Sequence, residues 1–438
     1  MTELGSIYSI NDNNSKTLVI EFSNIDICGN LNLNSGLVID NNYGVSGEAL
    51  ISQGSNMKPI WSSVNVSGSG GGGSSSGSSD TLHTLEPNST NSSDIINIIT
   101  NNFKQSLWWL NYSHIYNNGP NHGRGGGAFN GGVVATNGKI ILVPRNSSLI
   151  GIYDPDTNTY TNGPAHGKTN NGAFEGGVLA PNGKVILIAH NSPNIGIYDP
   201  DLNTYTDGPA HGNGNEAFDT GVLAPNGKII LAPFGQNNNV GIYDPIANTY
   251  TDGPTHNKGG WAFNGAVLTP DGKVILVPNQ SSNIGIYDPV ANTYTDGPAT
   301  SQYAGGVLTP DGKVVLVPQN SSNICIYDPV ANTTTFVSHG KGTNMGAFFG
   351  GVLAPDGKIV FAPAGSNYIG IYDPDANTYT DGPQISSGWG VNHFHGAILS
   401  PNGKIILIPY ANGAVGIYGR EFPLKDENDV LTPYFNKF

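Results

Sequence analysis

Apolar residues along most of this chain occur in short runs separated by glycine, proline, asparagine and aspartate. One order of runs recurs, and residues 350–383 show it as GGVLAPDGKIVFAP and, after a polar loop, YIGIYDPDANTYTDGP. β-branched and aromatic residues suit a pleated, half-buried surface, whereas Asp-Gly and Asp-Pro pairs favour tight turns. Each unit therefore predicts four short strands, and helix periodicity is absent from the repeat.

An Asn/Asp-Gly-Lys turn marks the period of this repeat. Its lysines are separated by 45, 44, 45, 40, 45 and 46 residues, intervals that fit a four-stranded propeller blade. These lysines are Lys139, Lys184, Lys228, Lys273, Lys313, Lys358 and Lys404. The copies predict an all-β fold, a seven-bladed β-propeller over residues 107–420.

The two ends of the array predict how the ring closes. The last copy stops after its third strand, where GREF follows Tyr418. A matching fourth strand, HIYNNGP, stands before the first copy, with Tyr116 aligned to Tyr160. We expect this segment to complete the last blade and to leave no open sheet edge.

Side chains that every copy repeats have a structural explanation. The tyrosine of the third strand is expected to pack between blades, and the aspartate before proline to cap a turn. Paired glycines such as Gly131 and Gly132 predict the innermost strand, where the blades crowd around the axis. None of these positions is therefore a candidate site.

The repeat resembles those of the kelch and galactose-oxidase-like propellers, most clearly in its YDP-x-x-N-T-aromatic portion. It differs from kelch in having tyrosine where kelch usually has tryptophan, and Val-Pro where kelch usually has paired glycine. Galactose-oxidase chemistry would need a cysteine crosslinked to a tyrosine beside copper, but Cys325 only replaces the glycine of the IGIY strand. Neither copper nor another cofactor is expected.

Residues 17–35 alternate between apolar and polar positions and predict two or three short strands. Because this segment is too small for a core of its own, we expect it to pack against copies of itself. The sequence YGVSGEALISQGSNMKPIWSSV that follows resembles the GxSGxxLxSxGxxxxPxW segment of phage and giant-virus fibre proteins. The resemblance implies that residues 1–66 form a β-rich attachment and oligomerisation segment, with a trimer favoured, on a virion surface.

Three further segments flank the propeller. Residues 67–80 form a Gly/Ser run that behaves as a flexible linker. Residues 81–106 predict a connector with a short helix that begins near Ser93 and carries apolar residues on one face. Residues 421–438 are predicted to be a C-terminal tail.

Composition and charge narrow the classes of function. Of the 438 residues 37% are hydrophobic and 11% are charged, and the formal net charge is −14. Because no Lys/Arg cluster interrupts the acidity, nucleic acid is not an expected partner. The chain has neither a basic region followed by an apolar stretch nor a long apolar run, so we expect synthesis in the cytoplasm, no signal peptide and no membrane insertion. Cys28 and Cys325 lie in different segments, which predicts neither a disulfide framework nor a metal-binding cysteine pair.

Loops on one face of the predicted propeller vary, and function on rigid scaffolds tends to lie in such loops. Histidines of the GPxH sequence recur on that face, where a ring of them would suit a metal or a pH switch. Duplication alone also explains them, and consecutive blades set them too far apart for one ion, so no metal is predicted. These residues are His122, His166, His211 and His256.

The positions at which one copy differs from the next are more informative. The residue before the glycine pair is predicted near the channel mouth, and scaffold needs alone would not demand its variety. In chain order these residues are Asn130, Glu175, Asp219, Asn264, Ala304, Phe349 and His395. The polar members and the histidine are candidate binding residues.

A second candidate site lies near the shortened connection DGPATSQYAGG, which lacks its histidine. It predicts a notch lined by aromatic side chains, and aromatic faces with amides suit sugar rings. Drift in loop length is the alternative explanation. The residues near this notch are Tyr303, His339, Lys341, Trp389 and His393.

Three functions are consistent with these features. The first is a structural virion or fibre protein that binds other virion or fibre proteins through its N-terminal segment and displays the propeller to a receptor, either a glycan or a host surface protein. The second is a lyase or hydrolase that acts at the channel mouth through Glu175, Asp219 and His395. The third is a kelch-like adaptor that binds protein.

Overall fold

The computed structural model describes residues 114–420, apart from 169–170, 344–345 and 386–391, and six strands between residues 7 and 63. The chain divides into two compact units, Met1–Asn97 and Ile98–Phe438. Every regular element among the described residues is a β-strand, so the predicted fold class is confirmed. No helix among them is long and apolar enough to span a bilayer.

Seven four-stranded antiparallel sheets make up the second unit. The first strands of the sheets are β8 (Phe129–Val134), β12 (Phe174–Leu179), β16 (Phe218–Leu223), β20 (Phe263–Leu268), β24 (Tyr303–Leu308), β28 (Phe348–Leu353) and β32 (Phe394–Leu399). The second strands are β9 (Ile140–Pro144), β13 (Val185–Ala189), β17 (Ile229–Pro233), β21 (Val274–Pro278), β25 (Val314–Pro318), β29 (Ile359–Pro363) and β33 (Ile405–Pro409).

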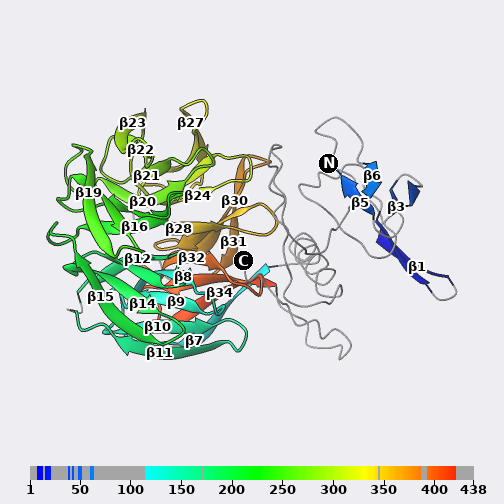
Figure 1. The fold of residues 1–438 in the computed structure, drawn as a ribbon, viewed down its shortest axis with the longest axis horizontal. Coiled ribbons are helices and arrows are strands. Elements are labelled where there is room, and N and C mark those ends of the chain that lie inside the picture. Colours follow the sequence, from blue (N-terminus) through cyan, green and yellow to red (C-terminus); the bar gives the residue numbers. More distant parts are fainter. Residues whose placement is uncertain are drawn as a thin grey trace, which may run out of the picture. The chain divides into compact units, whose positions relative to one another are not determined.

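The outer half of each sheet follows the same plan. The third strands are β10 (Leu149–Asp154), β14 (Asn194–Asp199), β18 (Asn239–Asp244), β22 (Asn283–Asp288), β26 (Asn323–Asp328), β30 (Tyr368–Asp373) and β34 (Ala414–Arg420). The fourth strands are β11 (Thr159–Ala165), β15 (Thr204–Ala210), β19 (Thr249–Thr255), β23 (Thr293–Ala299), β27 (Thr333–Ser338), β31 (Thr378–Gln384) and β7 (His114–Asn121). In Figure 1, β12, β16 and β28 lie toward the middle of the propeller, and β15, β19 and β23 lie at its rim.

Ring closure follows the predicted scheme. Strand β7 pairs with β34, and Tyr116 lies opposite Tyr418 as Tyr160 lies opposite Tyr153 in the first blade. The Nδ2 of Asn402 in the last blade also donates a hydrogen bond to the carbonyl of Pro155 in the first, at 2.7 Å. The seven-bladed ring and its latch are therefore confirmed.

The repeated residues of each blade stabilise turns and blade interfaces. The Tyr198 ring is buried in a cluster with Val133 and Ile150 of the preceding blade, while its hydroxyl donates to Asn203 Oδ1 at 3.0 Å. The carboxylate of Asp199 accepts two backbone N–H groups of the turn that follows. Both structural interpretations of the repeat are thereby confirmed.

Glycine backbones close the ring around the axis. A Cβ on Gly305 would lie 3.0 Å from the Cα of Gly350, and one on Gly350 would lie 3.0 Å from the Cα of Gly396. A Cβ on Gly396 would lie 3.5 Å from the Cα of Gly131, so the ring of neighbours returns to the first blade. Gly350 also has φ of +74°, a conformation that other residues rarely adopt.

The first unit contains three hairpins in its described part. They are β1 (Ile7–Asp12) with β2 (Ser15–Ile20), β3 (Val38–Ile39) with β4 (Asn42–Tyr43), and β5 (Glu48–Ile51) with β6 (Ile60–Ser63). Strand β2 includes the start of the predicted 17–35 strands. Residues 21–37, the short helix predicted near Ser93, and the tail 421–438 lie outside the described residues.

Candidate functional site

The structure places the variable residues of the first strands around one end of the central channel. We call these residues the inner ring: Asn130, Glu175, Asp219, Asn264, Ala304, Phe349 and His395. A cavity of about 170 Å³ on the axis is lined by five of them, together with glycine backbone from neighbouring positions. These five are Asn130, Asp219, Asn264, Phe349 and His395.

A β-bulge lies at each inner-ring position. In the first blade Phe129 pairs with Pro144, and regular pairing resumes only at Gly132, so Asn130 and Gly131 are left out of the ladder. The same shift recurs in every blade. Because a bulge re-aims a side chain without needing a particular residue, the inner ring can vary while the sheet is preserved.

A second set of variable residues, which the sequence analysis missed, flanks the inner ring. We call it the flanking ring: Arg145, His190, Phe234, Asn279, Gln319, Ala364 and Tyr410. Each member directly follows a second strand. The same comparison of copies that singled out the inner ring would have found these residues, because the second strands before them are nearly uniform.

Ionisable members of the two rings form one largely buried cluster. Arg145 Nε donates to Glu175 Oε1 at 2.5 Å, and His190 Nδ1 lies 3.7 Å from Glu175 Oε2. Glu175 and Asp219 are only 5% and 6% exposed. Burial, together with the charge and hydrogen bond of Glu175, raises the pKa of Asp219 well above its usual range. This environment therefore favours the protonated form of Asp219, while the Arg145 side chain binds Glu175.

Aromatic rings enclose His395 on both faces. Phe349 stacks on it at a centroid distance of 4.0 Å, and Tyr410 stacks on the other face at 3.7 Å. Burial, aided by the charge of Arg145, lowers the pKa of His395 to about 3, so the imidazole is neutral. Its Nδ1 has no hydrogen-bond partner within the described part of the chain.

Arg145 joins the aromatic and acidic parts of the site. Its guanidinium carbon lies 5.4 Å from the centre of the Tyr410 ring, while its Nε binds Glu175. A continuous set of contacts thus runs from Phe349 through His395 to Asp219. We call the residues of this set the channel cluster: Phe349, His395, Tyr410, Arg145, Glu175 and Asp219.

The repeated histidines lie between blades. His166 Nε2 donates to the Ser147 carbonyl at 2.7 Å, the backbone N–H of Lys168 donates to its Nδ1, and its ring packs edge-on against Phe174. Burial lowers the pKa of His166. His122, His211, His256 and His339 make equivalent contacts. Duplication of a structural contact therefore accounts for the repeat. No group of three or more metal-ligating side chains occurs in the described ranges.

The aromatic notch predicted near the shortened connection is not formed by Tyr303 and His339. Tyr303 is buried because it takes the core position that phenylalanine holds in other blades, and Ser321 Oγ donates to its hydroxyl at 3.2 Å. His339 is equally buried at a blade interface. Lys341 pairs with Asp381 at 2.7 Å. His393 is half-buried beside the channel strand β32, and Trp389 lies outside the described residues.

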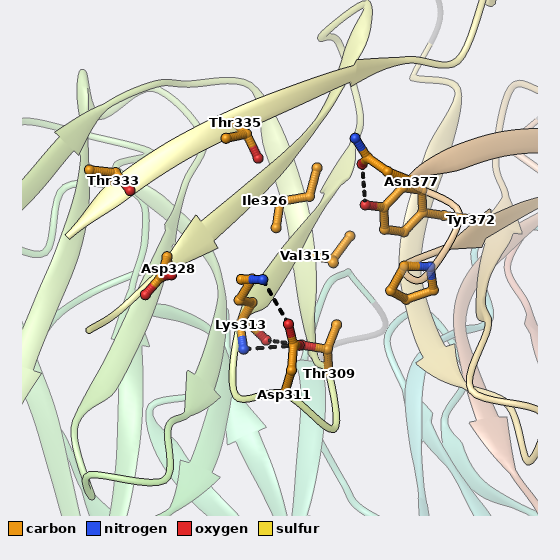
Figure 2. A pocket seen from close by; sticks show the side chains of 11 residues that line it. Thr309, Asp311, Lys313, Val315, Ile326, Asp328, Thr333, Thr335, Tyr372 and Asn377 are labelled. Carbon is orange, nitrogen blue, oxygen red and sulfur yellow. Dashed lines mark hydrogen bonds and ion pairs between the residues drawn. The ribbon is translucent and has the colours of Figure 1, made fainter. Parts of the chain in front are cut away.

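A different groove opens between the fifth and sixth blades, on the side of the propeller that carries the tight turns. Figure 2 shows Lys313 beside Asp311, with the Tyr372 hydroxyl pointing at Asn377. The groove measures about 290 Å³. An equivalent groove of about 300 Å³ lies between the second and third blades, lined by matching residues that include Lys184. This kind of groove is thus a feature of the repeat, unlike the channel cluster.

No known family model matches the chain, and no curated protein matches its sequence. A streptogramin B lyase structure matches with a TM-score of 0.61 and 15% identity over 71% of this chain and 99% of the lyase. Virginiamycin B lyase from Staphylococcus aureus matches with a TM-score of 0.59 and 16% identity, over 71% of this chain and 100% of the lyase. Hydrazine synthase from Kuenenia stuttgartiensis matches with a TM-score of 0.54 and 14% identity, over 67% of this chain and 96% of the synthase chain. At these identities the similarity shows the propeller fold alone.

Proposed function

We propose that the chain is a ligand-binding propeller whose N-terminal segment attaches it to a larger assembly. The observation that carries the binding role is the channel cluster. In a propeller whose blades are otherwise nearly alike, buried polar groups that do not repeat gather at one end of the channel. Buried ionisable groups in such a position are candidates for a functional site.

The propeller supplies its own evidence that the fold does not require the channel cluster. Ala304 holds the position of Glu175 in the fifth blade, and Ala364 holds the position of Arg145 in the sixth. Burying an ion pair costs desolvation free energy that is often not regained. Because alanine serves equally well at both positions, the pair is best explained by a ligand.

Thermal unfolding of the full chain in the presence of small molecules tests the binding role. Three classes of probe are used: neutral sugars and polyols, carboxylates, and amines. We expect one class to raise the melting temperature of the wild type, because a ligand that binds only the folded state stabilises it. The double variant Arg145→Ala/Glu175→Ala should lose this shift, and Lys313→Ala in the remote groove should keep it. Equal shifts in all three proteins would contradict the proposal.

The attachment role concerns the first unit. The fibre-type resemblance and the Gly/Ser linker support a structural virion protein, in which residues 1–66 form a homo-oligomer, a trimer being favoured, and bind other virion or fibre proteins. The propeller would then present its channel end to a receptor such as a glycan, and several copies would raise the avidity. Light scattering of the full chain tests this role, since a strictly monomeric particle would contradict it.

An enzyme that acts at the channel end is the second candidate. The protonated Asp219 beside the Glu175 carboxylate favours it, because general acid–base catalysis uses such pairs. The fold is also that of a streptogramin B lyase. Mass spectrometry of each bound probe after incubation is the test. Conversion by the wild type but not by Asp219→Asn would support an enzyme, and an unchanged probe would leave binding as the function.

A further inference from the structure

The hydrogen-bonding atoms of the channel cluster point to the chemical class of its ligand. From their geometry we infer that the site takes a small neutral polyol, such as a single sugar unit, whose hydroxyls bind His395 Nδ1 and the Asp219 carboxyl. This inference rests on the proposed binding function and deepens it.

His395 supplies the first contact. Its side chain is 7% exposed and lines the cavity, yet its Nδ1 has no hydrogen-bond partner among the described residues. A buried polar atom in this state costs free energy until a partner arrives. Because Phe349 and Tyr410 cover both faces of the ring, only its edge can receive that partner. The partner must therefore be a compact polar group.

The pairing of charges argues for a neutral ligand. Glu175 binds Arg145, so the only cationic side chain of the channel cluster is already occupied. An anion would find no free positive charge in the channel cluster, because Glu175 already offsets Arg145. A cation would find its one candidate counter-ion, Asp219, holding a proton that would first have to leave. A neutral ligand meets neither obstacle.

Hydroxyl groups match the remaining polar atoms best. A neutral imidazole nitrogen, a protonated carboxyl, and the side-chain amides of Asn130 and Asn264 can each donate or accept according to orientation. A hydroxyl does both, so a polyol can satisfy several of these groups at once. The apolar Phe349 ring beside them suits the CH face of a sugar.

The size of the cavity limits the ligand to one small unit. Its volume of about 170 Å³ corresponds to roughly five or six water molecules in the liquid. Drug-sized ligands occupy pockets of about 300 Å³ or more. A polyol or one sugar residue fits this volume, and a chain of sugars would place only its terminal unit inside.

Calorimetric titration of the full chain with single compounds tests the inference. The probes are glucose, galactose, N-acetylglucosamine and glycerol as neutral polyols, with acetate as the anion and ethylammonium as the cation. We expect at least one neutral probe to bind. Its heat should reveal no exchange of protons when the titration is repeated in a buffer of different ionisation enthalpy, because no group changes its charge.

Two variants test the contacts with residues that the inner ring accepts in other blades. His395→Phe keeps the stacked ring but removes its nitrogens, and Phe349 shows that the inner ring accepts phenylalanine. Asp219→Ala removes the carboxyl, and Ala304 shows that alanine fits. Each should weaken binding of the neutral probe about tenfold, because each removes a buried hydrogen bond. Lys313→Ala should leave the affinity unchanged.

The possible failures are distinguishable. Suppose that no neutral probe binds, that acetate or ethylammonium binds, and that the two variants weaken this binding. The polyol inference is then overturned, and the binding function stands. If neutral probes bind wild type and both variants equally, the assigned contacts are wrong. If no probe of any class binds, both the inference and the proposed function are overturned.

Discussion

The blade interfaces and the channel end are built from the same seven sheets, yet their side chains differ in kind. At the interfaces one contact recurs: a buried tyrosine hydroxyl donates to the asparagine of the next turn at 3.1 Å in the first blade, 3.0 Å in the second and 2.8 Å in the sixth. At the channel end equivalent positions hold Glu175, Ala304 and His395. The fold thus requires fixed side chains where blades pack, whereas at the axis it requires the bulge and its close-packed glycines but no particular inner-ring side chain.

Truncating an interface tyrosine should have the largest effect. Tyr198→Ala removes a fully buried ring between two blades, and we expect a loss of about 3–5 kcal/mol in the free energy of unfolding. Urea unfolding of the full chain measures it. Tyr198→Phe is the matched control, because it loses only the bond to Asn203, about 1 kcal/mol. Equal losses in both variants would show that ring packing does not hold the blades together.

Crowding at the axis should give the next largest effect. Gly350→Ala places a Cβ 3.0 Å from the Cα of Gly396 at φ of +74°, so we expect a loss of about 2–4 kcal/mol. Gly413→Ala is the control, since its Cβ would come no closer than 3.6 Å to any neighbour and its φ is not positive. If the two variants unfold at the same urea concentration, the glycine ring is not a tight contact.

The channel end should reveal itself through pH. The folded His395 stays neutral to about pH 3, whereas in the unfolded chain it binds a proton below about pH 6.5. Stability is therefore lost as the pH falls from that value. Between pH 6.5 and 5 the loss from this residue is about 2 kcal/mol.

His395→Phe tests whether the buried imidazole causes this loss. The variant should lose about 2 kcal/mol less stability than the wild type between pH 7 and pH 5, because only the contribution of the interface histidines remains. Urea unfolding at pH 7 and pH 5 gives the comparison. An unchanged difference between the two pH values would contradict the burial of the imidazole.

The last of these effects has the opposite sign. The pKa of Asp219 is raised in the folded chain, whereas its carboxyl ionises above about pH 4 in the unfolded chain, so it costs stability at neutral pH. Asp219→Asn should therefore stabilise the chain against urea at pH 7, and the gain should vanish near pH 4. A destabilised variant would mean that Asp219 serves the fold, as the interface residues do.

The sequence predicted the scaffold well because its signals are local and repeated. The Asn-Gly-Lys turns, the tyrosine before Asp-Pro and the displaced strand around Tyr116 each specify a contact that the structure contains. The location of the inner ring was also predictable, because a bulge fixes where those side chains point whatever they are.

The chemistry of the site was less predictable. Arg145 and Glu175 come from the first and second blades, whereas Phe349 comes from the sixth and both His395 and Tyr410 come from the seventh. Only ring closure places Arg145 over Tyr410 and so joins the two groups. Tyr303 follows the shortened connection and was therefore predicted to line a notch, whereas its place in the strand is that of the core phenylalanine in other blades.

A crystal structure of the full chain soaked with the neutral polyol of highest affinity would show whether the non-repeating residues at the channel end form the ligand site. We predict density for one small molecule on the axis, within hydrogen-bonding distance of His395 Nδ1 and Asp219. Density in the repeated grooves beside Lys313 and Lys184, with the channel end filled by solvent alone, would contradict the claim.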